Sequence, residues 1–190
     1  MAYEIYITDA FVCSARANNT SDKSYLLLTR EAGMLWASAK SVREERSKHR
    51  YALQEFSLAR VSLVRGKGGW RITGAEATAN LYWSSDSREE RAVLRNIVRL
   101  LHRCMQGETP APHLYDDIVE ALSKRGVLSP RLETLLSLRI LSTLGYVAPD
   151  AENRVLIDAE STLVALGEVT DAHEVSSKKS IARALEASHL

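Results

Sequence analysis

Apolar and polar residues alternate with a period of two along the first 80 residues, which is the pattern of half-buried β-strands. The runs that show it cover residues 3–16, 25–28, 34–40, 56–64 and 70–76. Five such strands, with no helix-length segment between them, predict a small antiparallel β-barrel over residues 1–80. The run at 56–64 changes phase midway, which predicts a β-bulge, and residues 66–69 form a glycine-rich hairpin turn.

After residue 80 the apolar period becomes that of helices. We expect helices at 87–105, 113–124, 131–144, 158–167 and 172–188. Ser87 and Glu90 have the spacing of a capping box, and Ser129 followed by Pro130 also suits a helix start. The leucine-rich helix at 131–144 should lie in the core of a bundle. The sequence therefore predicts an α+β protein, with a barrel domain at 1–80 and an all-α helical bundle domain at 81–190. We expect Trp83, in the linker, to pack between the halves.

Composition excludes several classes of protein. The chain has 190 residues and a formal net charge of +1, so its overall charge identifies no partner. Its two cysteines exclude a disulfide scaffold and a four-cysteine zinc site. No apolar run approaches the roughly 20 residues of a membrane-spanning helix, and the first residues do not resemble a secretory signal. We therefore expect a cytoplasmic protein.

One stretch is locally basic, because residues 40–71 carry nine Lys or Arg and three Asp or Glu. Such a surplus attracts polyanions, although it also fits a solvated loop and hairpin. In the run at 34–40, Leu35, Ala37 and Ala39 share one face, and Trp36 shares the other with Ser38 and Lys40. An outward Trp beside a lysine can stack on a base, or it can cover the end of the barrel. The candidate nucleic-acid-binding residues are Trp36, Lys40, Arg43, Arg46, Lys48, Arg50, Arg65, Lys67 and Arg71.

A second basic feature is a row of arginines along the first predicted helix of the second half. Its members are Arg88, Arg91, Arg95, Arg99 and Arg103, which fall within an arc of about 120°. The opposite side is apolar. Guanidinium groups suit phosphates or carboxylates, so the row could bind DNA or an acidic peptide, or it could be a solvated face.

Catalytic patterns are scarce. Residues 66–69 lack the spacing of a phosphate-binding loop, and no helix start follows them. His113, Asp117 and Glu120 have helical spacing, but without a fourth ligand they fit a helix start better than a metal site. We predict no catalytic residues, no metal, no cofactor and no enzymatic activity.

Residues 8–77 resemble the N-terminal domain of the RecO family of bacterial recombination mediators. The resemblance rests on residues 21–23 and 26–33, on 39–43 and 53–57, and on 65–69 and 73–76. The helical half resembles the family at 138–146, with Pro149 after it. The resemblance implies an oligonucleotide-binding (OB) barrel that binds single- and double-stranded DNA, anneals strands and assists the loading of RecA, in the cytoplasm at the nucleoid. It implies as partners RecR and the acidic C-terminal tail of the single-stranded-DNA-binding protein.

The chain departs from the family pattern in two places. Many members carry a zinc ribbon after the leucine-rich helix, but residues 148–154 contain no cysteine. We therefore expect the ribbon to be absent or replaced by a hairpin near 154–157. Residues 18–20 stand where the family usually has a glycine.

Three other hypotheses remain open from the sequence. The first is a protein-interaction adaptor that binds RecR or the acidic tail without binding DNA itself. The second is a small RNA-binding OB protein, and a distant third is an enzyme.

Overall fold

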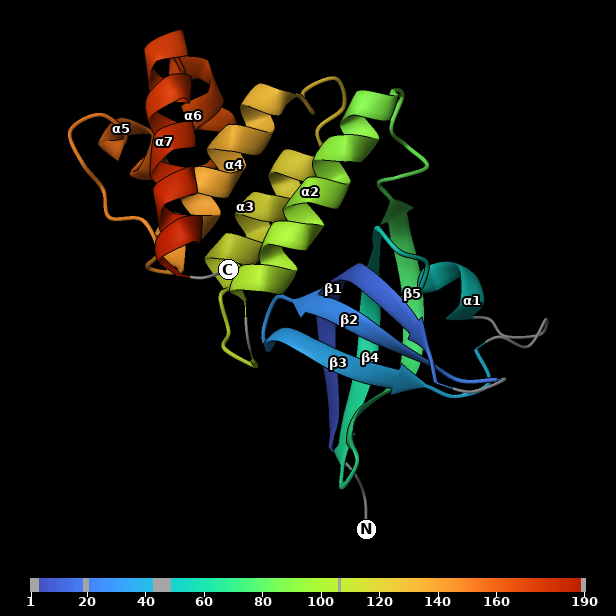
Figure 1. The fold of residues 1–190 in the computed structure, drawn as a ribbon. Helices are drawn as coiled ribbons and strands as arrows, with labels where there is room; N and C mark the ends of the chain where they lie inside the picture. The colour runs from blue at the N-terminus through green and yellow to red at the C-terminus, as the bar shows by residue number, and fades with distance from the viewer. Residues whose placement is uncertain (1–3, 19–20, 43–48, 106, 189–190) are drawn as a thin grey trace. The chain divides into compact units, whose positions relative to one another are not determined.

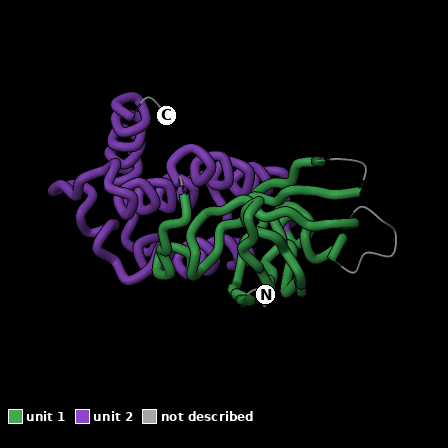
Figure 2. The backbone as a smooth tube through the Cα atoms, turned by 90° about the horizontal axis from the view of Figure 1, so that it is seen from below, with its two compact units in different colours: residues 1–84, 107–115 green, residues 85–106, 116–190 purple. Residues whose placement is uncertain are grey.

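The computed structural model describes residues 4–18, 21–42, 49–105 and 107–188 (Figure 1). The chain divides into two compact units (Figure 2). The first contains residues 1–84 and 107–115, and the second contains residues 85–106 and 116–190. None of the described helices is long and apolar enough to cross a membrane.

The first unit is a closed five-stranded barrel, which confirms the predicted fold class. Its strands are β1 (Ile5–Ala17), β2 (Lys23–Thr29), β3 (Gly33–Ala39), β4 (Ser57–Gly66) and β5 (Gly69–Asn80). A short helix, α1 (His49–Ala52), lies between β3 and β4 in the chain. Around the barrel the strands follow the order β1-β2-β3-β5-β4. The sequence did not predict α1.

One strand pair corrects the prediction that the barrel is antiparallel throughout. β3 and β5 pair in parallel through Ala37 with Trp70 and Ser38 with Arg71, whereas the other four pairs are antiparallel. The reason is geometric, since a closed ring with an odd number of strands cannot alternate direction at every step. The parallel pair is therefore the place where the barrel closes.

The barrel interior is filled by the inward positions of all five strands. Leu35, Ala37 and Ala39 lie in this core, as their alternation predicts, together with Tyr25 and Trp70. Burial raises the pKa of the Tyr25 phenol to about 12, because the charged phenolate would lose its hydration there.

Bulges in β5 fit this strand around the barrel. Register shifts occur opposite Leu58/Ala59 and opposite Ser62/Leu63 of β4. The bulge predicted within 56–64 is therefore wrong, because β4 alternates regularly from Ser57 to Leu63 and the extra residue at each shift lies on β5. The unpaired residues are Thr78 and Thr73, whose hydroxyls donate to the carbonyl oxygens of Leu58 (3.1 Å) and Ser62 (3.2 Å).

A segment distant in sequence completes the barrel unit. Residues 107–115 belong to it, and Gly33 lies against Thr109 with a φ of +68°. A Cβ at Gly33 would lie 2.3 Å from the Thr109 carbonyl oxygen, so this position requires glycine.

The second half is helical, as predicted. Its helices are α2 (Arg88–Cys104), α3 (Pro112–Ser123), α4 (Pro130–Thr143), α5 (Arg154–Ile157), α6 (Thr162–Glu168) and α7 (Asp171–Ala187). The leucine-rich α4 packs against α2, α5, α6 and α7, and its buried residues include Leu132, Leu136 and Leu141. The prediction that this helix lies in the core is thus confirmed.

The predicted helix starts are also present. Ser129 accepts a hydrogen bond from the Leu132 amide at 3.3 Å, and Ser87 accepts one from the Glu90 amide at 3.0 Å. The Glu90 carboxylate, however, accepts from the Asp86 amide (2.7 Å) rather than from Ser87, so the second bond of the capping box is displaced by one residue.

A buried arginine on α4 organises the stretch where a hairpin was expected. Arg139 pairs with Asp117 of α3 at 3.0 Å and donates to the carbonyl oxygens of Leu156, Ile157 and Ala159. Asp117 also accepts from the amide and hydroxyl of Thr162. The hairpin expected near 154–157 is therefore wrong. Residues 154–157 form α5, because the Arg139 guanidinium binds the carbonyls at the C-terminal end of this turn.

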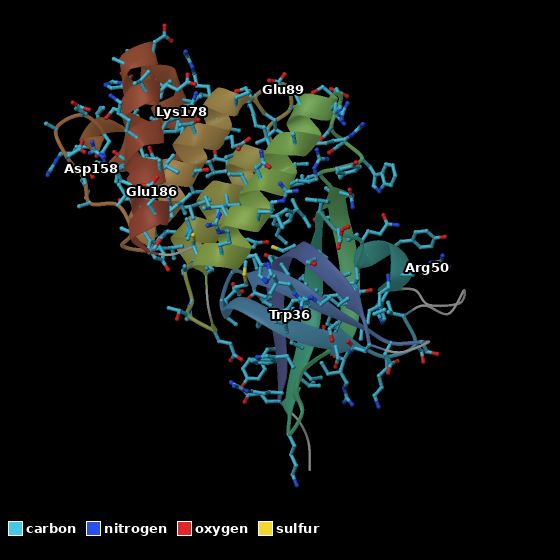
Figure 3. All side chains as sticks on the ribbon, viewed as in Figure 1. Trp36, Arg50, Glu89, Asp158, Lys178 and Glu186 are labelled. Carbon is cyan, nitrogen blue, oxygen red and sulfur yellow. The ribbon has the colours of Figure 1, made fainter. Side chains whose placement is uncertain are left out.

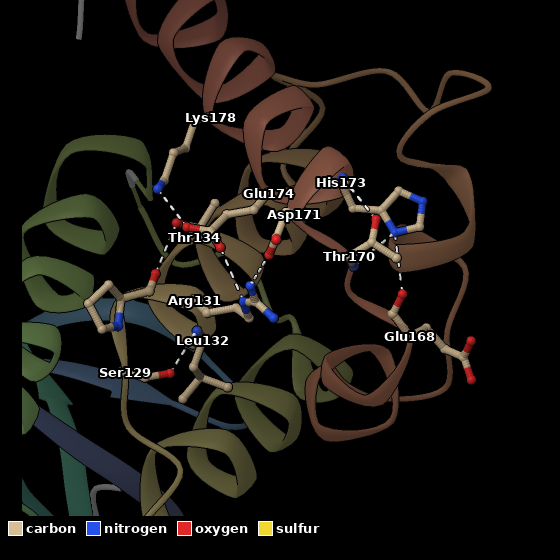
Figure 4. A network of polar contacts seen from close by, with 11 residues as sticks. Ser129, Arg131, Leu132, Thr134, Glu168, Thr170, Asp171, His173, Glu174 and Lys178 are labelled. Carbon is tan, nitrogen blue, oxygen red and sulfur yellow. Dashed lines mark hydrogen bonds and ion pairs between the residues drawn. The ribbon is translucent and has the colours of Figure 1, made fainter.

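A second network joins α4 to the first turns of α7 (Figure 4). The Arg131 guanidinium binds both Asp171 and Glu174, and Glu174 also accepts from Lys178 at 2.6 Å. These bonds, that from Lys178 foremost, lower the pKa of Glu174. At the start of α7, Thr170 and His173 form a reciprocal cap. Because the ions of this network are largely exposed, it orients α7 more than it stabilises the fold.

The Asp117–Arg139 pair predicts a large effect of removing one partner. Asp117→Ala leaves a buried guanidinium without its counterion, and we expect the free energy of unfolding to fall by about 3 kcal/mol. Urea denaturation measures this difference. Glu120→Ala, an exposed position on the same helix, is the control and should change stability by less than about 0.5 kcal/mol. Equal effects of the two substitutions would contradict the structural role of the pair.

The raised pKa of Tyr25 predicts that the protein loses stability at alkaline pH. Since its folded-state pKa lies above the ordinary value near 10, its contribution is fully present below pH 10 and is lost as the pH rises towards 12. We expect Tyr25→Phe to lose less stability than the unsubstituted protein between pH 9 and pH 11 in urea denaturation. The same loss in both proteins would show that the Tyr25 phenol does not titrate as its burial requires.

Candidate nucleic-acid interface

Closure of the barrel brings the outer face of β3 beside the β4–β5 hairpin. Two residue pairs of the parallel β3–β5 contact join Ala37 and Ser38 to the start of β5. In addition, the Ser38 hydroxyl donates to the Trp70 carbonyl oxygen at 3.4 Å. Ser38 is directly paired with Arg71, and Trp36 lies two residues earlier on the same face. An aromatic ring and a basic hairpin therefore share one region of the barrel surface.

Trp36 lies outside the barrel core, on the face that its alternation predicts (Figure 3). It is half-buried, and the guanidinium carbon of Arg16 lies 4.4 Å from its ring centroid. This is a cation–π contact with an exposed arginine of β1. Arg16 was missed by sequence reasoning, because only the β1–β2–β3 register brings it to Trp36.

The hairpin turn borders a small, open basic cavity. The cavity has a volume of about 240 Å³ and is lined by Ser38, Val64, Arg71 and residues 66–69. Lys67 and Arg71 are both exposed, and neither forms an ion pair with a residue that the structure describes. No lining residue is acidic. The cavity therefore presents two free cations next to glycine backbone.

Arg65, by contrast, already has partners. Its guanidinium pairs with Glu108 at 3.0 Å and lies 5.3 Å from the ring centroid of Trp70. Tyr6 contacts the same indole edge-to-face, with the centroids 5.3 Å apart. Trp70 is buried, as predicted, and among the described atoms its Nε1 has no hydrogen-bond partner. Arg65 is thus partly neutralised and fixed in position, unlike Lys67 and Arg71.

The remaining basic candidates of the first half are Lys40, Arg43, Arg46, Lys48 and Arg50. Lys40 is exposed just after β3, and Arg50 is exposed on α1 (Figure 3). Arg43, Arg46 and Lys48 lie outside the described residues.

The linker tryptophan is held by contacts within the barrel unit. Trp83 is 73% exposed. Its indole nitrogen donates to the Gln54 side chain at 3.2 Å, and its ring meets Tyr82 edge-to-face. These local contacts fix the indole on the barrel unit.

The arginine row lies on α2, opposite a buried stripe that includes Val93, Ile97 and Leu101. Arg88, Arg99 and Arg103 are exposed, whereas Arg91 and Arg95 are half-buried. Arg91 donates to the Ser85 carbonyl oxygen at 2.9 Å and Arg99 reaches Asn96 at 3.5 Å. Because Arg91 also holds the helix start, the row is only partly available to a ligand.

The possible metal ligands on α3 are not brought together. Asp117 is engaged by Arg139 and Thr162, as described above. Within the described ranges, no three His, Cys, Asp or Glu side chains are grouped so that they could hold a metal ion.

Comparison with known proteins relates the barrel unit to a known family. Residues 1–81 match the family model described as recombination protein O, N terminal. A protein of Myxococcus xanthus named DNA repair protein RecO is 31% identical over 113 residues, which are 59% of this chain and 46% of the relative. A protein of the same name from Desulfitobacterium hafniense (strain DSM 10664 / DCB-2) is 27% identical over 146 residues, which are 75% of this chain and 52% of the relative. The chain thus spans about half the length of these relatives. By its barrel and these matches, the chain is similar to proteins of the RecO family, and its first 81 residues match that family's N-terminal domain.

Proposed function

We propose that this chain is a DNA-binding accessory protein of recombinational repair. It binds single- and double-stranded DNA on the outer face of β3 and the β4–β5 hairpin. The observation that carries the proposal is the pair of free cations, Lys67 and Arg71, beside the Trp36 face. Proteins that bind single-stranded nucleic acid usually combine two elements. Cations neutralise the phosphate backbone of the nucleic acid, and a neighbouring aromatic ring stacks on a base.

Each element of this surface has a distinct task. Lys67 and Arg71, with exposed Lys40 and Arg50, neutralise phosphates. Trp36 stacks on a base either beside Arg16 or in place of it, since a guanidinium and a base compete for an indole face. Arg43, Arg46 and Lys48 contribute further charge in the same proposal. Arg65 contributes less, because Glu108 already neutralises it.

Strand annealing and assistance in RecA loading follow from the same proposal. A protein that holds single strands mainly by their phosphates leaves the base edges free to pair. The proposal needs neither a nucleotide nor a catalytic residue. RecR and the acidic tail of the single-stranded-DNA-binding protein are the proposed protein partners.

Salt dependence tests the phosphate contacts. Anisotropy of a labelled single strand should show affinity falling with salt, by roughly 0.7 log units per log unit of salt for each neutralised phosphate. The double variant Lys67→Glu/Arg71→Glu should weaken binding by at least about tenfold and, since it removes two phosphate contacts, lower the salt slope by about 1.4.

The matched control is Lys179→Glu/Arg183→Glu on α7, which makes the same charge change at two exposed positions. It should bind nearly as tightly as the unsubstituted protein. Equal losses in the two double variants would mean that net charge, and not the hairpin, governs binding. No binding at low salt would favour the adaptor that binds RecR without binding DNA.

The arginine row supports a second binding role, for an acidic peptide. Arg88, Arg99 and Arg103 are exposed along α2, and guanidinium groups form paired hydrogen bonds with carboxylates. Arg99→Glu should weaken binding of an acidic tail peptide by about tenfold, because it replaces an attractive charge with a repulsive one.

Calorimetry with that peptide measures the change, and Arg183→Glu on α7 serves as the control. If Arg99→Glu keeps the full peptide affinity, the row does not receive the tail. Competition between the peptide and DNA then tests whether the row binds DNA instead or is a solvated face.

A further inference from the structure

The hairpin cavity contains more positive charge than one backbone phosphate requires. Lys67 and Arg71 both line it, no acidic residue does, and each is free of ion pairs with described residues. An internal phosphodiester carries one negative charge. A phosphomonoester carries close to two at neutral pH, because its second pKa is near 6. Two unpaired cations around one small cavity therefore match a monoester better than a diester.

The shape of the cavity agrees with the same ligand. With a volume of about 240 Å³ it is smaller than most sites for drug-sized ligands. It lies at a strand end, where the β4–β5 ladder stops at Gly66 and Gly69. Because the cavity is small and open to solvent, the end of a chain can enter it while the rest of the strand continues along the surface.

The turn also supplies backbone donors. Lys67 and Gly68 lie beyond the last ladder pair, so the ladder does not use their N–H groups. A Cβ added at Gly66, Gly68 or Gly69 would meet nothing within 4 Å, so the backbone here borders open space. Backbone N–H groups in a turn are common ligands of phosphate oxygens.

We propose that this cavity binds the terminal phosphomonoester of a nucleic-acid strand, and that the protein thereby distinguishes phosphorylated from hydroxyl strand ends. This inference rests on the proposed function. Lys67 and Arg71 hold the phosphate oxygens, the turn amides complete its hydrogen bonds, and the strand continues past Ser38 towards Trp36 along β3.

The experiment compares single strands of equal length and sequence that end in 5′-hydroxyl, 5′-phosphate or 3′-phosphate. We expect one phosphorylated end to raise the affinity by about tenfold over the hydroxyl end, the order expected for an added charge-assisted contact. Deoxyadenosine 5′-monophosphate, added as a competitor at millimolar concentration, should reduce this preference without abolishing strand binding.

Three variants locate the effect. Lys67→Ala and Arg71→Ala should each remove most of the end preference, and Gly68→Glu should abolish it by placing a carboxylate in the cavity. Gly68 lacks a positive φ, so a side chain there is not strained. Arg60→Ala is the control, because Arg60 is exposed on β4, outside the cavity, and should keep the preference.

The outcomes separate the two proposals. Equal affinity for all strand ends overturns this inference but leaves the proposed DNA binding intact. A preference that survives all three cavity variants overturns the assignment to this cavity. Competition by the mononucleotide without any gain from a phosphorylated end would show a free-nucleotide site, and it would overturn the strand-end assignment. If the protein binds none of these strands, the proposed function itself is wrong.

Discussion

The short parallel pairing of β3 with β5 is the contact on which the candidate interface depends. Five strands cannot close a ring with antiparallel pairs alone, and this barrel places its one parallel pair at residues 37–38 and 70–71. The pair contains only two residues from each strand, with one additional bond from Ser38. It alone aligns the Trp36 face with the β4–β5 turn. Without it, Lys67 and Arg71 would extend from a hairpin unconnected to Trp36.

Local constraints support this closure from both sides. Bulges at Thr73 and Thr78 let β5 bend, and their hydroxyls satisfy carbonyls of β4. Gly33 lets the 107–115 segment approach the start of β3. In the helical unit, Arg139 has the corresponding role, since one buried guanidinium binds α3 and the carbonyls at the end of α5. Each unit thus depends on a few specific contacts within an otherwise ordinary apolar core.

Sequence patterns predicted the features that depend on neighbours along the chain. Alternation correctly placed Leu35, Ala37 and Ala39 inside the barrel, and serines correctly marked the starts of α2 and α4. Features that depend on register were missed, because no local pattern records which strands meet. These include Arg16 above Trp36, Glu108 beside Arg65 and the carboxylate of Asp117 beneath Arg139. For the same reason a bulge was wrongly predicted in β4, whereas the extra residues of the β4–β5 pair lie on β5.

The central claim is that nucleic acid binds where barrel closure joins β3 to the β4–β5 hairpin. Amide chemical-shift mapping during titration with a short single strand tests this claim most directly, because it locates the contact without altering the protein. The account predicts the largest perturbations at Trp36, Ser38 and the amides of residues 67–71. Perturbations confined to α2, with those barrel amides unchanged at saturation, would contradict it.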